Sequence, residues 1–292
     1  MLLVVEDLHW ADPSSLALLG LVVDHAATSR LMAVLSFRPE FSPPWAGRSH
    51  VQQLQLGRLD QTDARELLDG VPGADSLSDE VLEAVVRKTD GVPLFVEEVV
   101  KIVLEKRAET GGEIGPEAVD VIPDTLQESL LARLDQLGDA KGVAQLGAML
   151  GREFSYRILN AVAGLEEEKL QGLLADLLHA ELLFQKGVPP RSLYLFKHAL
   201  IQDAAYHSLL RKDRVSNHLR IGKLLEERFP DVTKSQPDTM ARHFAAGGEP
   251  AKAGQYYLEA ASFAAQKSAA EEAADYVSQG LEQLEKLPEG QE

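Results

Sequence analysis

Two short apolar runs near the N-terminus are separated by an amphipathic segment. Leu2–Val5 and Leu31–Phe37 are rich in aliphatic residues, and runs of this length predict strands that are fully buried in a parallel sheet. Between them, Asp12 and Pro13 are typical of a helix start, and apolar residues recur at helical spacing over 16–23. A strand, a helix and a strand in this order predict a right-handed parallel crossover.

From Leu59 onward the periodicity is helical. A third short strand is expected just before it, over 51–56. The expected helices start at capping residues or at prolines. Two of them begin after Asp60 and Ser78. A third covers 94–106 after Gly91-Val92-Pro93, and a fourth covers 125–137 after Pro123. Between the third and the fourth, residues 110–117 are polar, glycine-rich and aperiodic, which predicts a linker.

The remaining chain divides into two helical patterns. Over 141–210 we expect three helices, a β-hairpin and a further helix, with hairpin strands at 182–186 and 193–196 around a turn at 187–190. Helices followed by such a hairpin are typical of a winged-helix module. Beyond it, alanine-rich helices are expected in pairs, which predicts a tetratricopeptide-like array that is cut short at its C-terminus. These helices cover 217–229, 238–246, 250–266 and 269–284.

Composition narrows the function classes. The 292 residues include 29 Lys and Arg against 46 Asp and Glu, a formal charge of −17, which does not favour nucleic acid or an anionic membrane as the main partner. No cysteine is present, so disulfides, thiolate metal sites and a catalytic thiol are excluded. The apolar stretches fall far short of the roughly 20 residues that cross a bilayer. With no basic residue before the first apolar run, no signal peptide is predicted, and we expect a cytoplasmic protein.

The strongest candidate for chemistry is the acid pair Glu6 and Asp7. It follows the first predicted strand, at the edge where open α/β sheets place their ligands. In a nucleotide-hydrolysing site one acid holds Mg²⁺ and the other orients the attacking water. The alternative is that the pair is only solvated or caps the following helix.

Four motifs in order carry a resemblance to a known family. They are Leu2-Leu3-Val4-Val5-Glu6-Asp7, Ser36-Phe37-Arg38-Pro39-Glu40, Gly91-Val92-Pro93-Leu94 and Phe196-Lys197-His198-Ala199-Leu200. In this order the chain resembles the STAND class of signal-transduction ATPases, and more closely the large bacterial predicted ATPases in which a nucleotide cyclase domain often precedes the ATPase.

The resemblance implies a mainly α fold with a small α/β part. The implied parts are a partial P-loop ATPase core with a parallel sheet (1–58), a helical lid (59–109), a linker (110–122), a winged-helix module (123–210) and tetratricopeptide-like repeats (211–292). It also implies ATP or ADP and Mg²⁺ as the cofactors of the intact protein.

The same resemblance implies a role for each candidate residue. Glu6 and Asp7 look like the Walker B acids and the Mg²⁺ ligands, with Glu6 where an Asp is more usual. Arg38 looks like the arginine that senses the γ-phosphate. Pro93 looks like the proline that packs beside the base. His198 looks like the winged-helix histidine that approaches the β-phosphate of ADP.

Each of the last three residues also has an alternative role. Arg38 could form a surface ion pair with Glu40, Pro93 could simply start a helix, and His198 could be a structural histidine.

One absence limits the expected activity. No G-x-x-x-x-G-K-[ST] motif occurs in the 292 residues, so the backbone nest and the lysine that cradle phosphates are missing. We therefore expect a truncated or degenerate switch module that by itself neither binds ATP tightly nor hydrolyses it. Expected partners are a protein bound by the helical repeats and the missing N-terminal ATPase or cyclase portion.

Two alternatives from other classes stay open. The chain could be a non-enzymatic interaction module that uses the helical repeats. It could also be a winged-helix DNA-binding regulator, since 186–228 holds nine Lys or Arg against four acids. The candidate recognition helix, however, starts Glu166-Glu167-Glu168, which repels phosphate, so nucleic acid is the less favoured partner.

Overall fold

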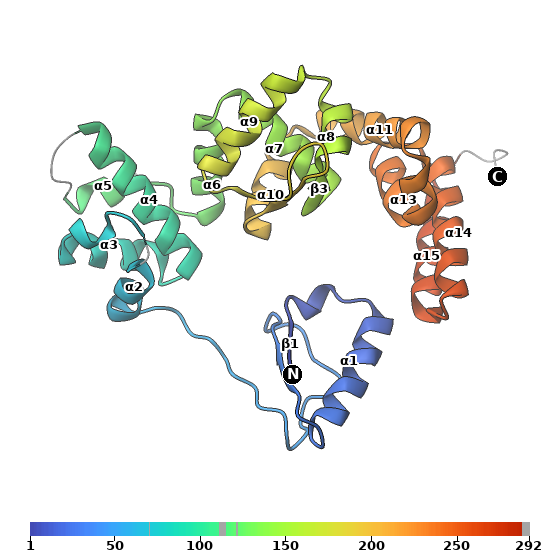
Figure 1. The fold of residues 1–292 in the computed structure, drawn as a ribbon, viewed down its shortest axis with the longest axis horizontal. Coiled ribbons are helices and arrows are strands. Elements are labelled where there is room, and N and C mark those ends of the chain that lie inside the picture. The colour runs from blue at the N-terminus through green and yellow to red at the C-terminus, as the bar shows by residue number, and fades with distance from the viewer. Residues whose placement is uncertain (70, 111–114, 121, 288–292) are drawn as a thin grey trace. The chain divides into compact units, whose positions relative to one another are not determined.

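The computed structural model describes residues 1–69, 71–110, 115–120 and 122–287. These residues form fifteen α-helices and five short strands, a mainly α fold with a small α/β part (Figure 1). The chain forms two compact units, which are described separately. The first comprises Met1–Gln55 and Arg214–Glu292, and the second comprises Leu56–Asp213. Within the described ranges, no helix has the length and apolar character needed to cross a membrane.

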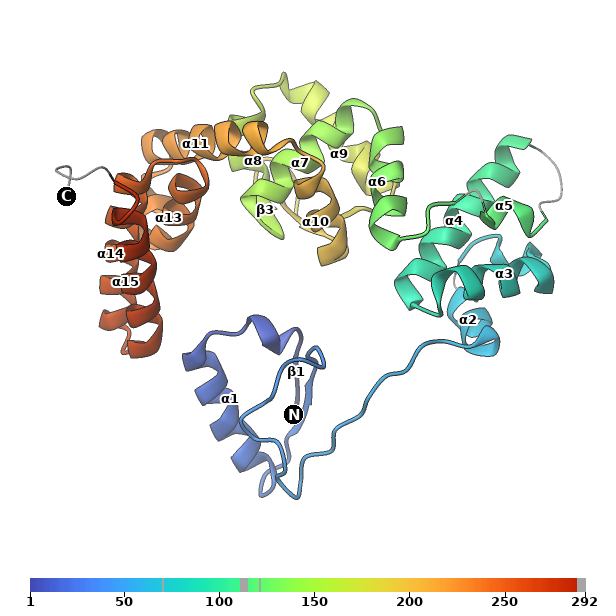
Figure 2. The same cartoon turned by 180° about the vertical axis from the view of Figure 1, so that it is seen from behind.

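The N-terminal α/β segment contains the predicted parallel crossover. Strands β1 (Leu2–Val5) and β2 (Met32–Leu35) pair in parallel, with Leu2 opposite Met32 and Val5 opposite Leu35. Helix α1 (Pro13–Ala26) connects them and lies beside β1 in both views (Figures 1 and 2). Its N-cap Asp12 accepts a hydrogen bond from the Ser15 N–H at 2.8 Å, so the predicted cap is confirmed.

The prediction that these strands are fully buried is wrong. Their exposure alternates, and the outward-facing side chains of Leu2, Val4 and Met32 are 63%, 55% and 65% exposed. The opposite face packs on a small core that includes Leu8 and Trp45. The reason is that the described residues supply a covering layer for one face of the sheet only.

The predicted third strand is also wrong. Residues 51–56 adopt neither helix nor strand, and the side chains of Leu54 and Leu56 are 75% and 93% exposed. Alternating apolar residues form a strand only where a neighbouring strand takes their backbone hydrogen bonds, and among the described residues β2 pairs with β1 alone.

The first helical cluster opens the second unit. It consists of α2 (Gln61–Leu68), α3 (Asp79–Thr89), α4 (Pro93–Thr110) and the one-turn helix α5 (Glu117–Asp120). Asp60 and Ser78 cap α2 and α3 as predicted. Helix α5 lies inside the stretch expected to be a linker, and Val119 and Ile122 are buried in the core of this cluster. The predicted linker residues 111–114 and 121 lie outside the described residues.

The second helical cluster combines five helices with a three-stranded antiparallel sheet. The predicted hairpin is confirmed as β4 (Leu183–Lys186) and β5 (Leu193–Phe196). A third strand, β3 (Glu153–Ser155), was not expected and pairs with β5, which gives the order β3-β5-β4. The helices are α6 (Leu126–Gln136), α7 (Asp139–Leu150), α8 (Tyr156–Ala163), α9 (Glu167–His179) and α10 (Ala199–His207).

The C-terminal helices are α11 (Arg211–Arg228), α12 (Pro230–Ser235), α13 (Pro237–Ala246), α14 (Pro250–Gln266) and α15 (Ala270–Leu284). The four predicted helices are confirmed, α11 starts six residues earlier than expected, and α12 was not predicted. Helices α14 and α15 lie side by side (Figure 2). They approach closely at Gly254 and Gly280, where an added Cβ would lie 2.9 Å from Leu284 and 3.3 Å from Tyr257.

Candidate functional site

The acid pair lies at the joined carboxyl ends of β1 and β2. Hydrogen bonding continues past both strands, since the Ser36 N–H donates to the Val5 carbonyl at 3.0 Å and the Leu8 N–H donates to the Ser36 carbonyl at 2.9 Å. The Asp7 N–H donates to the Ser36 hydroxyl at 3.1 Å. Parallel pairing therefore brings Glu6, Asp7 and Ser36 to one edge of the sheet.

The backbone at Asp7 directs the chain out of the strand. Asp7 has φ 58° and ψ 44°, a left-handed conformation that Asp tolerates better than most residues. The one-turn helix Leu8–Trp10 follows at once, and its Leu8 side chain is fully buried in the small core. Glu6 is exposed and Asp7 is partly exposed, so two carboxylates and the Ser36 hydroxyl offer oxygen donors of the kind that hard cations such as Mg²⁺ prefer.

Arg38 lies at the same edge, three residues after the end of β2. Its side chain is exposed, and its carbonyl accepts a hydrogen bond from the Phe41 N–H at 3.0 Å, which closes a turn. Phe37 and Phe41 on either side pack against the small core, which anchors this turn.

His9 is a residue that the sequence reasoning left out. It directly follows the acid pair and Leu8, and its Nε2 is hydrogen-bonded to the Trp10 indole. Its Nδ1 is buried and has no hydrogen-bond partner among the described residues. A histidine two residues after an acid at a strand end is the signal that could have drawn attention to it.

Pro93 begins α4 at a strained turn. Gly91 has φ +64°, and a Cβ there would lie 2.2 Å from the Leu59 carbonyl oxygen. The Leu59 N–H also donates to the Gly91 carbonyl at 2.8 Å. This geometry explains the glycine of the Gly-Val-Pro motif structurally, and the alternative role of Pro93 as a helix start is confirmed.

His198 lies immediately before α10 and is half-buried. Burial lowers the pKa of His198, and the charge of Lys197 lowers it further, whereas Glu97 and Glu98 of α4 act in the opposite direction. His198 therefore lies within electrostatic range of α4, and Glu97 is one helical turn after Pro93.

The five predicted site residues fall into two groups. Glu6, Asp7 and Arg38 belong to the first compact unit, whereas Pro93 and His198 belong to the second. Glu6, Asp7 and Arg38 follow the two paired strands at one edge of the sheet, whereas Pro93 starts α4 and His198 precedes α10. Within the described part of the chain, no three His, Asp or Glu side chains form a cluster that could hold a metal ion.

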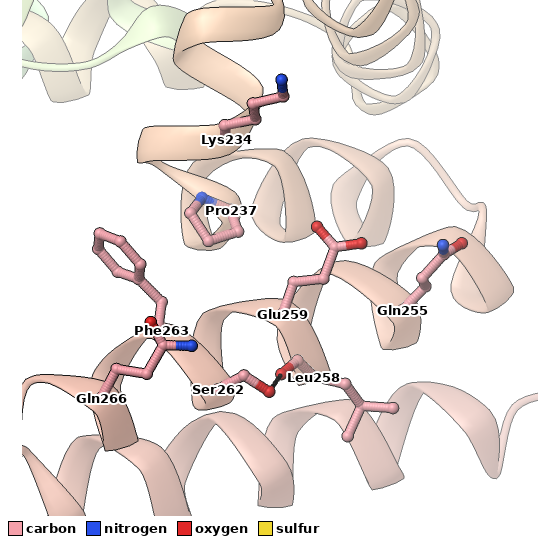
Figure 3. A pocket seen from close by; sticks show the side chains of 8 residues that line it. All are labelled: Lys234, Pro237, Gln255, Leu258, Glu259, Ser262, Phe263 and Gln266. Atoms are coloured by element: carbon pink, nitrogen blue, oxygen red, sulfur yellow. Dashed lines mark hydrogen bonds between the residues drawn. The ribbon is translucent and has the colours of Figure 1, made fainter.

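A separate open pocket lies on the C-terminal helices (Figure 3). Its volume is about 380 Å³, and its walls come from α12, α13 and α14. The side chains that line it are Lys234, Pro237, Gln255, Leu258, Glu259, Ser262, Phe263 and Gln266. The Leu258 and Phe263 side chains are 47% and 36% exposed, and the Lys267 ammonium lies 4.1 Å from the Phe263 ring centre.

This pocket combines apolar side chains with one acid and one lysine. Sequence reasoning expected a binding surface on these helices but named none of its residues, because α12 and its Lys234 were not predicted. The apolar residues at i and i+5 of α14 are a weak signal, since they do not follow the main helical period.

Comparison with known proteins gives one distant relative and no family. No family model matches the chain. A protein of Rhizobium meliloti (strain 1021), named "Uncharacterized protein R02095", is 27% identical over 281 residues. The match covers 95% of this chain and 27% of the relative, so the chain spans about a quarter of the length of the relative that it matches.

Proposed function

We propose that the chain is part of a nucleotide-dependent regulatory switch of the STAND class, namely the part that contains the Mg²⁺-binding and sensing residues. The observation that carries this proposal is the acid pair at the joined ends of two parallel strands, with the Ser36 hydroxyl beside Asp7. Open α/β sheets bind ligands at this edge.

The residues present fit one part of a nucleotide and not another. Carboxylate and hydroxyl oxygens at the end of β1 suit Mg²⁺, and the exposed guanidinium of Arg38 suits a phosphate. The 292 residues contain no glycine-rich phosphate cradle with its lysine. We infer that the site handles the metal and the terminal phosphate, and that tight binding of a triphosphate requires a cradle from another segment.

In this proposal a bound Mg²⁺ would supply positive charge to neutralise the phosphate oxygens. Glu6 would hold the metal through water, because its longer side chain places the carboxylate further from the strand end than an aspartate would. Asp7 would also hold the metal and would orient the attacking water, with its backbone fixed by Ser36. Arg38 contacts the terminal phosphate. Pro93 packs beside the base, and His198 approaches the β-phosphate in the resting state.

The finer architecture is part of the same proposal. We assign the first helical cluster as the lid, the second as a winged-helix module, and the C-terminal helices as tetratricopeptide-like repeats. The three-stranded sheet of β3, β4 and β5 beside five helices supports the second assignment. The tight contact of α14 and α15 at small residues supports the third.

A titration tests whether tight nucleotide binding requires a phosphate cradle from another segment. The purified chain is titrated with fluorescent ATP in the presence of Mg²⁺, and binding is followed by anisotropy. We expect no saturation in the micromolar range, because the phosphate cradle is missing. Micromolar binding that the Asp7→Asn substitution does not change would contradict both the proposed site and its dependence on another segment.

The pocket on α12–α14 favours a second candidate function, the binding of a protein segment by the C-terminal helices. Its exposed leucine and phenylalanine give an apolar surface flanked by Lys234 and Glu259. Peptides selected on the chain from a displayed library should lose about tenfold in affinity with Phe263→Ser, the effect of removing one central contact. The peptides should keep their affinity for the Val277→Ser variant, since Val277 is a matched exposed residue of α15. Equal affinity for both variants would remove this candidate.

A further inference from the structure

A set of charged side chains of alternating sign, here called the junction, joins the first helical cluster to the second. Its buried part is the ion pair of Glu98 on α4 and Arg133 on α6, whose side chains are 4% and 8% exposed. Arg133 also donates to the Ala180 carbonyl at 2.7 Å, at the end of α9. A buried pair of this kind is costly to separate, because the charge left behind would be unpaired.

The outer part of the junction consists of Glu181 and its two lysine partners. The Lys101 ammonium of α4 lies 2.5 Å from the Glu181 carboxylate, and the Lys197 ammonium lies 3.0 Å from the same oxygen. Glu181 therefore ties the first cluster to the segment that leads from β5 into α10. The next residue along that segment is His198.

The backbone of Glu181 supports a specific role for its side chain. Glu181 has φ +54°, a conformation that costs a residue with a Cβ free energy and favours glycine. The two lysines also lower the pKa of Glu181 to about 2, Lys101 contributing most through its hydrogen bond. Glu181 is therefore ionised throughout the physiological pH range. Its side chain is 54% exposed to water.

The two parts of the junction differ in strength because they differ in burial. The Glu98–Arg133 pair is enclosed, whereas Glu181 is half exposed and the Lys101 and Lys197 side chains are 17% and 24% exposed. Salt therefore reaches and screens the Glu181 pairs, and a single pair of this kind changes an equilibrium by about two- to fivefold. The inner pair is thus suited to act as a pivot, and the outer pairs are suited to open and close.

We propose that Glu181 is a releasable latch that binds Lys101 and Lys197 together and so positions His198 against α4. This inference rests on the proposed switch role of His198. It makes Glu181, Lys101 and Lys197 positioning residues: with the latch closed the two helical clusters hold one arrangement, and with it open they separate about the Glu98–Arg133 pair.

The experiment measures the distance between the two clusters in the full chain without nucleotide. Because the sequence has no cysteine, Glu83→Cys on α3 and Ala175→Cys on α9 give the only two thiols for spin labels. Both positions are exposed. Pulsed electron resonance should give one narrow distance distribution at low salt. Glu181→Gln, or 1 M NaCl, should raise the population at other distances about two- to fivefold for each pair lost.

Matched variants separate a latch from a general structural role. Glu168→Gln, an exposed glutamate on α9, should leave the distribution unchanged. Lys197→Gln should broaden it, and Lys197→Arg should restore it, since Arg keeps the charge. The NMR signals of the His198 ring should shift in Lys197→Gln and Glu181→Gln only.

Two results would overturn the latch. One is a distribution in Glu181→Gln identical to that of the unsubstituted chain at low salt. The other is equal broadening in Lys197→Gln and Lys197→Arg, which also decides the matter if Glu181→Gln does not fold. Since no nucleotide is present, either result leaves the proposed nucleotide role to be judged by the ATP titration.

Discussion

At the scale of single residues, close approach and burial explain positions that the sequence pattern does not. Gly91 has a left-handed backbone and lies against the Leu59 carbonyl, so its place in the Gly-Val-Pro motif has a structural cause whatever the motif binds. His218 and His243 lie far apart in the sequence but form a buried pair, with their Nδ1 atoms 2.9 Å apart. Both histidines were passed over in the sequence because neither belongs to a spaced metal or catalytic motif.

Replacement of Gly91 by alanine should destabilise the chain by at least about 2 kcal/mol, because it adds a clash with backbone to an unfavourable φ. Urea unfolding followed by circular dichroism measures the change. Gly172→Ala is the control: this glycine is helical, with no atom within 4 Å of an added Cβ, and alanine there should stabilise by about 0.5–1 kcal/mol. A Gly91→Ala chain as stable as the original would show that the turn can relax.

The histidine pair predicts loss of stability in acid. Burial lowers the pKa of His218 to about 4 and that of His243 to about 3, from 6.5 in the unfolded chain. Between pH 6.5 and 4 the unfolded state therefore binds more protons, so the free energy of unfolding falls as the pH is lowered, by roughly 3 kcal/mol for each histidine.

Urea unfolding at several pH values between 7 and 4 measures this slope. Replacing both histidines by leucine should flatten it, whereas His179→Leu, at an exposed position, should not. An unchanged slope in the double variant would assign the acid sensitivity to other groups.

At the scale of elements, local sequence signals predicted most helices. They failed where strand formation depends on a pairing partner elsewhere in the sequence. Side-chain caps at Asp12, Asp60, Ser78 and Thr125 lie where the sequence places helix starts. Strand β3 was missed because three residues carry no pattern of their own and are held by pairing with β5. The apolar residues at 51–56 were misread as a strand because no local signal reports that a pairing partner is absent.

The exposed face of β1 and β2 predicts weak protection of these strands. Each has four residues, one face lies open, and the core beneath them is small. Hydrogen exchange read by mass spectrometry should find the β1 amides exchanging on the order of 100-fold faster than those of α7, which packs in the largest core. Equal protection of β1 and α7 would contradict this account of the segment.

At the scale of the whole molecule, the candidate site could be predicted in part. The Glu6–Asp7 pair was predicted from a strand followed by acids, and Arg38 from the resemblance to a known family. Parallel pairing of β1 with β2 places them at one edge. The charges that link α4 to the second cluster could not be found, because Glu98, Arg133 and Glu181 are separated by 35 and 48 residues and no sequence motif relates them. Ion pairs between helices depend on packing that is set only when the unit folds.

The central claim is that Glu6 and Asp7 bind a divalent cation at the joined ends of β1 and β2. Mn²⁺ is the direct probe, because it replaces Mg²⁺ and broadens the NMR signals of nearby amides. In the full chain, millimolar Mn²⁺ should broaden the amides of Asp7, Leu8 and Ser36 first. Asp7→Asn should remove this broadening, and Asp24→Asn, at the other end of α1, should preserve it. Absence of broadening at the three amides, or broadening that Asp7→Asn does not change, would contradict the claim.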